Sequence, residues 1–211
     1  MSHDGHSRQH SFATKFSSAE AVAAYARRSQ RLPMRNRGLW SALRGLAPTG
    51  TWLDLGCGPG LVTLEAARRF PDLRLIGLDS SEHMIDYASG RMADDGVADR
   101  VEFRVGNAAD PDVLRGLAPA NGIISTYTLH HFDDGIEAIK AMAGALVPGG
   151  PMLLHDFRRI WWLKRWLPTA DAYRPDQAAM LMADAGMADV RIKNHFPYAM
   201  TVMGRRPITR T

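Results

Sequence analysis

Hydrophobic and polar positions along the chain form two kinds of segment. Short apolar runs, such as 51–55, 75–79 and 122–126, predict buried strands of a parallel sheet. Longer segments between them, such as 61–70 and 136–146, repeat apolar residues at helical spacing and predict amphipathic helices. Strand and helix therefore alternate along most of the chain, which is typical of an α/β fold with a parallel sheet.

The pattern predicts one domain. Residues 1–17 are expected to be a flexible polar tail, and residues 18–211 a single domain that begins with two helices in front of the core. The other expected elements are helices at 18–31, 40–46, 84–92 and 175–185, strands at 101–105 and 152–154, and a final antiparallel pair at 190–196 and 200–202. The expected architecture is a doubly wound, Rossmann-like sheet of seven strands, with one antiparallel strand near the C-terminus.

The stretch 51–60, Thr-Trp-Leu-Asp-Leu-Gly-Cys-Gly-Pro-Gly, joins a predicted strand to a predicted helix through a glycine-rich turn. Glycine permits positive φ and the close approach of a ligand. The spacing is G-x-G-x-G, with Leu61 where a dinucleotide fingerprint has its third glycine, and the Gly-Lys-Ser/Thr ending of a P-loop is absent. Asp79 follows Gly60 by 19 residues, where an acidic residue binds ribose hydroxyls. The stretch therefore predicts a loop for a nucleoside with free ribose hydroxyls.

These residues resemble the motifs of the class I S-adenosylmethionine-dependent methyltransferases. Residues 53–60 resemble the family's first motif, 77–80 its ribose motif and 105–108 its adenine motif. The segments 129–132 and 146–150 are similar to those around its fourth and fifth strands. The resemblance extends over nearly the whole chain, and it implies S-adenosyl-L-methionine as the cofactor and methyl transfer as the activity.

The resemblance also implies roles for single residues. Asp79 would accept both ribose hydroxyls, although it is also placed to cap the next helix. Asn107 stands where the family usually has an aspartate, and its amide oxygen would accept from the adenine amino group. Asp54 would hold the cofactor's ammonium group, directly or through water. The expected cofactor residues are Asp54, Gly56, Cys57, Gly58, Gly60, Asp79, Ser80, Met84, Asn107, Ala108, Thr126 and Tyr25.

Three of these residues have more than one interpretation. Met84 is placed to pack against the adenine face or in the core. Tyr25 is placed to touch the methionine end of the cofactor or to pack as a surface aromatic. Cys57, the single cysteine of the chain, excludes an internal disulfide and is interpreted as a small loop residue rather than a nucleophile.

Methyl transfer requires few catalytic groups from the protein, because the methyl group is already activated on a sulfonium. Proximity and alignment supply most of the acceleration, and a base is needed only for an acceptor that holds its proton at neutral pH. His130 is the candidate base, since an unperturbed imidazole titrates at about pH 6.5. A structural role for His130 is the alternative, and His131 is expected on the pocket wall. No metal is expected, because the sequence has no H-E-x-x-H and no cysteine pair.

Composition and charge indicate the class of protein and its location in the cell. The 211 residues are 45% hydrophobic and 23% charged, which is ordinary for a globular protein. No apolar run is long enough for a transmembrane helix, and the N-terminus lacks the apolar region of a signal peptide. These features predict a cytoplasmic protein. The net charge of +4 comes mainly from arginine clusters, interpreted as a solvated face rather than a nucleic-acid surface.

The acceptor site is expected in the N-terminal helices and in the segments 127–132 and 157–173. Within the latter, 158–168 holds three tryptophans and four basic residues. It predicts a lid over an aromatic or anionic small molecule, a peripheral membrane contact, or tryptophans packed in the core. A small-molecule acceptor is favoured, with RNA or protein as the alternatives; against a nucleic acid, the Asn/Asp-Pro-Pro-Tyr/Phe motif of base methylation is absent. A cofactor-binding protein without turnover is the third interpretation, and no pattern indicates an oligomeric state.

Overall fold

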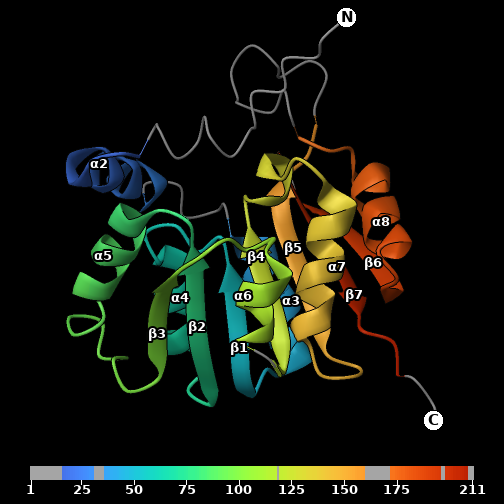
Figure 1. Cartoon of the computed structure of the whole chain (residues 1–211), viewed down its shortest axis with the longest axis horizontal. Helices are drawn as coiled ribbons and strands as arrows, with labels where there is room; N and C mark the ends of the chain where they lie inside the picture. Colours follow the sequence, from blue (N-terminus) through green and yellow to red (C-terminus); the bar gives the residue numbers. More distant parts are fainter. Residues whose placement is uncertain (1–15, 31–35, 118, 160–171, 196–197, 209–211) are drawn as a thin grey trace, which may run out of the picture.

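The computed structural model describes residues 16–30, 36–117, 119–159, 172–195 and 198–208, and one mixed sheet runs through them (Figure 1). Its strands are β1 (Gly50–Leu55), β2 (Leu73–Asp79), β3 (Val101–Val105), β4 (Gly122–Thr126), β5 (Pro151–Phe157), β6 (Ala188–His195) and β7 (Ala199–Arg205). They lie in the order β3-β2-β1-β4-β5-β7-β6, with β1 to β5 paired in parallel and β7 antiparallel to both of its neighbours. The predicted seven-stranded sheet, with its antiparallel strand near the C-terminus, is confirmed.

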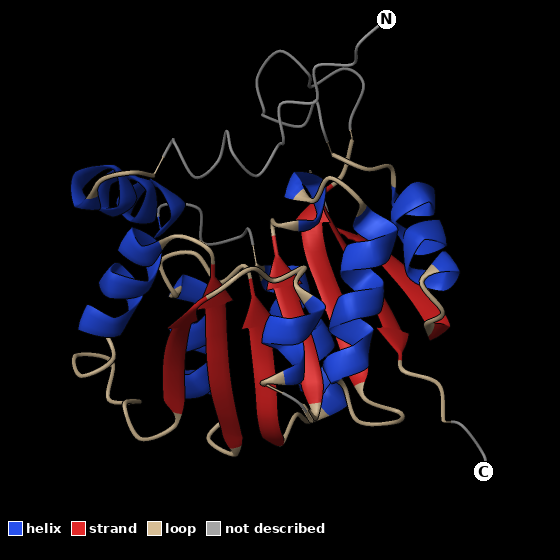
Figure 2. Cartoon of the chain, in the orientation of Figure 1, coloured by secondary structure: helices blue, strands red, loops and turns tan. Residues whose placement is uncertain are grey.

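Helices cover both faces of this sheet (Figure 2). One face packs against α3 (Arg37–Leu46) and α4 (Leu61–Arg69), and the other against α6 (Pro111–Arg115), α7 (Gly135–Ala145) and α8 (Pro175–Asp184). Two further helices, α2 (Ala19–Gln30) and α5 (Glu82–Gly90), contact each other near β2 and β3, and a short 3-10 helix, η1 (Leu129–His131), follows β4. The fold is therefore a three-layer α/β arrangement.

Burial on both faces explains the unbroken apolar runs of the central strands. In β1, Trp52 packs with residues of α3 and α4, whereas Leu53 and Leu55 pack with the cluster under α6, α7 and α8. Leu53 and Leu55 are fully buried, and each such side chain contributes roughly 1.5–3 kcal/mol of transfer free energy. Because neighbouring side chains of one strand enter opposite cores, a shift of register by one residue would exchange both sets.

The order in which successive strands are added to the sheet reverses between β1 and β4. From β1 the chain builds outward through β2 and β3, and it then returns to place β4 on the other side of β1. Ligands of open α/β sheets bind at such a switch point, outside the carboxyl ends of the strands. The carboxyl ends of the parallel strands meet at the upper edge in Figure 1, where α2 and η1 also lie.

Two short helices were not predicted, namely α6 and η1. The start of α6 does carry local signals, because the Asp110 side chain accepts hydrogen bonds from the N–H groups of Asp112 and Val113, and Pro111 occupies the first helical turn. The helix is only five residues long, however, and shows no full apolar repeat. Short helices of this kind are found by their caps rather than by periodicity.

Some expectations concern residues outside the described ranges. They are the tail as far as residue 15 and the tryptophan-rich lid, including Trp161, Trp162 and Trp166. Phe16, which falls within the predicted tail, is buried and packs edge-to-face on Tyr25, with ring centroids 4.9 Å apart. Within the described part of the chain, the search for a helix long and apolar enough to cross a membrane found none.

Candidate cofactor and acceptor site

The glycine-rich turn after β1 is built on left-handed backbone. Gly56, Gly58 and Gly60 have φ values of 75°, 53° and 71°, a region in which side chains other than glycine are strained. The N–H groups of Gly56 and Cys57 donate to the carbonyl oxygen of Leu78, at 2.8 and 3.0 Å, which ties the loop to the end of β2. A Cβ atom at Gly56 would lie 2.5 Å from the Thr128 side chain, whereas one at Gly58 would meet no described atom within 4 Å. The loop is therefore packed below and open above Gly58.

Asp79 faces this loop from the end of β2. Its Oδ2 accepts a hydrogen bond from the Gly58 N–H at 2.8 Å, and its Oδ1 accepts one from the Ser81 N–H at 3.0 Å. Burial raises the pKa of Asp79, and the N–H donors of Ser81 and Gly58 oppose that effect. Ser81 is the N-cap of α5, and its side chain accepts from the Met84 N–H. Asp79 is therefore not merely a helix cap.

Asp54 lies below the loop and is fully buried. Its Oδ2 accepts a 2.6 Å hydrogen bond from the Thr63 hydroxyl, while its Oδ1 has no hydrogen-bond partner among the described residues. Burial raises the pKa of Asp54 to about 7, the Thr63 hydrogen bond lowers it, and the charge of Asp79 adds to the rise. The same burial and the two carboxylates raise the pKa of the Cys57 thiol well above its ordinary value. Cys57 thus stays protonated, which agrees with a small loop residue and not with a nucleophile.

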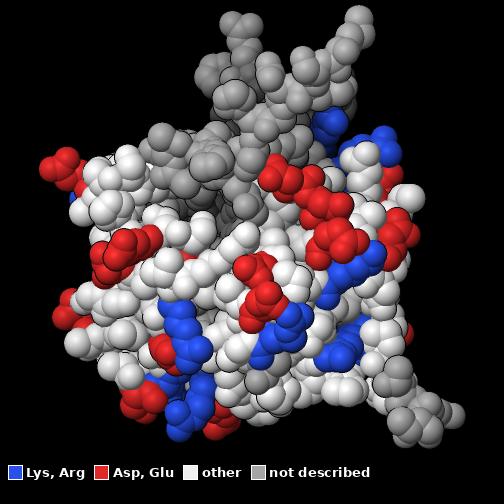
Figure 3. Space-filling view, in the orientation of Figure 1, with Lys and Arg blue, Asp and Glu red and all other residues white. Residues whose placement is uncertain are grey.

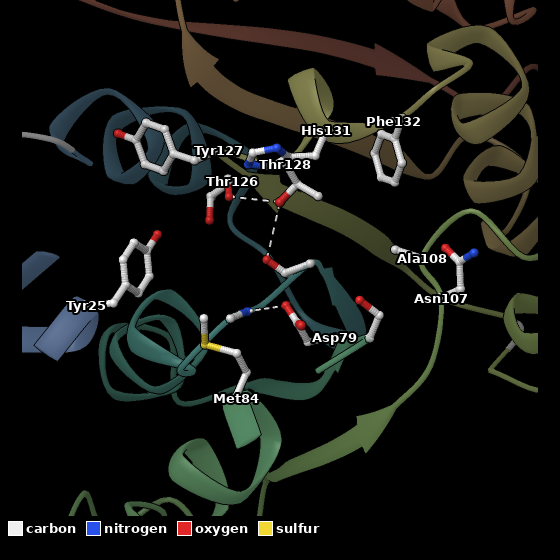
Figure 4. A pocket seen from close by; sticks show the side chains of 13 residues that line it. Tyr25, Asp79, Met84, Asn107, Ala108, Thr126, Tyr127, Thr128, His131 and Phe132 are labelled. Atoms are coloured by element: carbon white, nitrogen blue, oxygen red, sulfur yellow. Dashed lines mark hydrogen bonds between the residues drawn. The ribbon is translucent and has the colours of Figure 1, made fainter. Parts of the chain in front are cut away.

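A cavity that is partly open to solvent lies above the loop (Figure 4). Side chains from several elements converge on it, with Tyr25 on α2, Asp79 at the end of β2, and His131 on η1. Its described lining is Tyr25, Gly56, Gly58, Asp79, Ser80, Met84, Asn107, Ala108, Thr126, Tyr127, Thr128, His131 and Phe132. Most of the expected cofactor residues are therefore brought together, opposite residues from the segment expected to hold the acceptor.

Three of the expected cofactor residues do not line this cavity. Cys57 lines a smaller adjoining cavity together with Tyr25. Gly60 is the N-cap of α4, where a Cβ atom would lie 2.7 Å from the Phe103 ring, so its role is close packing. Asp54 lies beneath the loop, as described above.

Local contacts refine the other assignments. Asn107 lines the cavity, but its Oδ1 already accepts a 2.9 Å hydrogen bond from the Ala109 N–H, so one lone pair remains for another donor. Met84 is almost completely buried, in a cluster with Phe16 and Val22, and yet it reaches the cavity. Both interpretations of Met84, as core and as cavity wall, thus describe the same side chain.

His130 lies behind the cavity wall rather than on it. Its Nδ1 is 2.8 Å from Asp156 Oδ1 and 3.0 Å from Oδ2, and its ring centroid is 4.0 Å from that of His131, which does line the cavity. Asp156 lies beyond the strand expected at 152–154 and was not among the expected site residues. The available signal was a polar residue at the carboxyl end of a buried strand.

The described residues fit a cofactor with positive charge and a ribose. Asp79 offers carboxylate oxygens at the cavity, the loop is open above Gly58, and Asp54 keeps a buried oxygen without a hydrogen-bond partner. Within the described residues, no group of three or more His, Cys, Asp and Glu side chains is placed to hold a metal ion. A sheet of this order, with a glycine loop after β1 and an acidic residue at the end of β2, defines the class I S-adenosylmethionine-dependent methyltransferases.

Comparison with known proteins agrees with this class. The family described as "Methyltransferase domain" matches residues 53–150. A trans-aconitate 2-methyltransferase of Streptomyces avermitilis is 35% identical over 99 residues, which make up 47% of this chain and 36% of that protein. An O-methyltransferase family protein from Burkholderia thailandensis has a TM-score of 0.76 at 25% identity, covering 96% of this chain and 64% of that chain. Residues 53–150 thus match a methyltransferase-domain family, and the fold of the chain is shared with solved methyltransferases.

A further solved structure agrees in fold. Human N-acetylserotonin methyltransferase, solved in complex with S-adenosylmethionine, has a TM-score of 0.76 at 18% identity and covers 93% of this chain and 59% of that chain. The chain therefore spans about a third of the trans-aconitate relative and less than two thirds of both solved proteins.

Proposed function

We propose that the protein transfers the methyl group of S-adenosylmethionine to a small-molecule acceptor. The proposal rests on one observation: the glycine loop and Asp79 line the same cavity as Tyr127, His131 and Phe132. A cofactor held on one side of this space has its reactive end close to the other side. Such closeness is the main requirement of an in-line displacement.

The chain's own residues have distinct tasks in this proposal. S-adenosylmethionine supplies a methyl group that is already activated on a positively charged sulfur. Asp79 accepts the ribose hydroxyls, and Gly58 lets the cofactor approach the loop without a side chain in the way. Asp54 balances the positive ammonium group from below the loop, where its partnerless oxygen is buried. Tyr25 and Met84 give the cavity apolar surface on the side of α2 and α5.

The surface supports a small molecule over a nucleic acid. On the face shown in Figure 3, acidic and basic side chains are interspersed. Several charged side chains of the described residues pair with neighbours along the chain, as Lys140 does with Glu137 and Arg174 with Asp176. Nucleic-acid surfaces instead gather positive charge on one face. The alternatives of an RNA or protein acceptor, or of cofactor binding without turnover, are outcomes of the test below.

Two measurements test the proposal. Calorimetry should show binding of S-adenosylmethionine and of its demethylated product, and preference for NAD would contradict it. Labelled methyl-S-adenosylmethionine should then be incubated with the protein and a bacterial extract that is separated afterwards into small molecules, RNA and protein. We expect the label among the small molecules. Label in RNA or protein identifies the wrong acceptor class, and binding without any transfer identifies a protein that lacks turnover.

A further inference from the structure

We propose that the groove between residues 41–46 of α3 and the strands β6 and β7 is a second binding site, and that its ligand is a small phosphomonoester with an apolar body. The groove has a volume of about 520 Å³, which lies in the size range of small-molecule sites. No described residue lines both this groove and the cavity above the glycine loop. The inference therefore goes beyond methyl transfer and does not depend on it.

Three cations lie on the face of β6 and β7 that forms the groove. Residues paired across an antiparallel ladder share a face, and Arg191 pairs with Met203 and Lys193 with Thr201. Alternate residues of one strand also share a face, so Arg205 lies on the same side of β7 as Met203. Arg191, Lys193 and Arg205 all line the groove. Positions 191 and 193 are about 7 Å apart along β6, so both long side chains can reach one phosphate group.

The described part of the chain does not neutralise these cations. None of the three forms an ion pair with a described carboxylate. Among the described lining residues Asp189 is the one carboxylate, at the point where the pairing register of β6 and β7 shifts. Three positive side chains against one negative leave this lining with a net charge of +2. A phosphomonoester has a complementary charge of about −1.5 to −2 at pH 7, whereas a monocarboxylate has a single negative charge.

Protection of the sheet edge is the simpler explanation of the charges on β6, because charged side chains on an edge strand oppose pairing with another sheet. It accounts for Arg191 and Lys193. It does not account for Arg205, because β7 is paired with a strand on each side. The guanidinium of Arg205 is also held in place, since its Nη1 donates a 2.9 Å hydrogen bond to the Gly149 carbonyl oxygen. A guanidinium has five N–H donors, so others remain for a ligand.

The inner wall of the groove is polar and ordered. Thr201 lines the groove and is only 3% exposed, and its hydroxyl oxygen lies 2.9 Å from His195 Nε2 and 2.8 Å from His155 Nδ1. The His195 ring packs so closely on α3 that no room remains for a Cβ atom at Gly38. Burial and the charge of Lys193 lower the pKa of His195, so its ring is neutral at pH 7 and adds no charge to the lining.

Apolar side chains complete the groove. Ala42 and Leu46 line it from α3 and Met203 from β7, and all three are partly buried against the core cluster on this face of the sheet. An inorganic phosphate ion would leave these side chains uncovered, whereas an apolar group attached to the phosphate would remove them from water. The cations and the apolar side chains together therefore fit a phosphomonoester with a small apolar body.

The ring signals of His195 report on this site, and phenyl phosphate is a suitable probe. In the ¹H–¹³C spectrum of the histidine rings, phenyl phosphate should shift the His195 signals and leave those of His83, which is exposed on α5, unchanged. Inorganic phosphate lacks the apolar body and benzoate has one negative charge, so each should bind about tenfold more weakly. Equal binding of either ion would show that the phosphomonoester assignment is wrong. A shift of His131 without one of His195 would place the probe in the other cavity and overturn the inference.

Variants at exposed positions test the cations without disturbing the core. Arg191→Gln and Lys193→Gln should each weaken phenyl phosphate binding about tenfold or more, because each removes a charged hydrogen-bond donor. Lys193→Arg should keep most of the affinity, and Arg74→Gln, at an exposed position of β2, is the matched control that should keep all of it.

Native affinity in both Gln variants would contradict a site at these cations. Binding of hexaglutamate without binding of phenyl phosphate would make the groove a docking surface for an acidic protein segment, and would also overturn the inference. Failure of the protein to bind S-adenosylmethionine would remove the proposed function and leave this site unaffected, because the two sites share no described residue.

Discussion

The N–H of Gly58 donates a 2.8 Å hydrogen bond to Asp79 Oδ2, which joins two residues that are 21 positions apart and that both line the cavity. The bond connects the turn after β1 with the end of β2, so the carboxylate is oriented by the loop that lines the same cavity. Preorganised carboxylates of this kind lose little freedom when a ligand binds. The two motifs therefore form one structural unit.

Replacing Asp79 by Ala should weaken binding of S-adenosylmethionine by roughly 1.5–3 kcal/mol, the range for a hydrogen bond to a charged partner. The variant loses the ribose acceptor and also releases the Gly58 N–H. Calorimetry measures the effect, and Asp72→Ala, at an exposed position before β2, is the matched control. Unchanged affinity in Asp79→Ala would show that the ribose lies elsewhere.

Asp54 should make cofactor binding depend on pH. Its pKa is raised by burial to about 7 from an ordinary 3.8, so the folded protein holds a proton there that the unfolded chain has lost. Between these values the folded state binds more protons, and stability should fall as pH rises, levelling off above about pH 7. The difference is on the order of 4 kcal/mol, at about 1.4 kcal/mol per pKa unit. Binding of the positively charged cofactor should follow the opposite trend and weaken below pH 7, where Asp54 is protonated.

Asp54→Asn isolates this effect, because the amide keeps the Thr63 contact and cannot ionise. Denaturant unfolding at pH 5 and pH 8 should show less pH dependence in the variant than in the native protein. Calorimetry at the same pH values should show a smaller change in affinity for S-adenosylmethionine. If the variant keeps the full pH dependence of both quantities, another group is responsible.

Most of the sheet could be predicted, because its central strands β1, β4 and β5 are largely buried and form apolar runs. β2, for instance, reads as an apolar run that closes at Asp79. The end of β5 could not be predicted, because the strand continues through His155 and Asp156, which are buried and polar. Their partners are far along the chain, with Thr201 Oγ1 at 2.8 Å from His155 Nδ1 and His130 beside Asp156. Partners that are distant along the chain leave no signal in the local sequence pattern.

The same distinction holds for the site. The glycine loop and Asp79 were recognisable because their spacing along the chain sets their geometry in space. The pairing of His130 with Asp156 joins residues 26 positions apart on two different elements, so it required the structure. The bond from Ala109 to the Asn107 oxygen was also hidden, because a short polar side chain has several local partners to choose from.

Tyr25 provides a further test, because it extends from α2 to line the cavity in which we propose that the cofactor binds. It packs edge-to-face on Phe16 and lines both the main cavity and the smaller one beside Cys57. Tyr25→Ala should weaken S-adenosylmethionine binding by about 1–2 kcal/mol through lost apolar contact, and Tyr25→Phe should keep most of the affinity. Calorimetry distinguishes the two variants, and equal affinities for Ala and Phe would show that α2 does not cover the cofactor.

Gly58 and Gly60 should respond differently to alanine, although both have positive φ. At Gly60 a Cβ atom would lie 2.7 Å from the Phe103 ring and 2.8 Å from Ala88 Cβ, inside the packed region below the loop. Gly60→Ala should therefore destabilise the fold by the left-handed backbone cost of about 1–2 kcal/mol plus the cost of overpacking, about 1–3 kcal/mol. Thermal and denaturant unfolding measure this loss.

At Gly58 a Cβ atom would meet no described atom within 4 Å, because it enters the space above the loop. Gly58→Ala should then carry only the backbone cost and remain folded, but the methyl group should occupy space that the cofactor needs. We expect a loss of S-adenosylmethionine affinity at least as large as that in Asp79→Ala, with a smaller loss of stability than in Gly60→Ala. If Gly58→Ala binds the cofactor normally, the ligand does not approach the loop at this point, and the cofactor edge must lie nearer to Asn107 and Thr126.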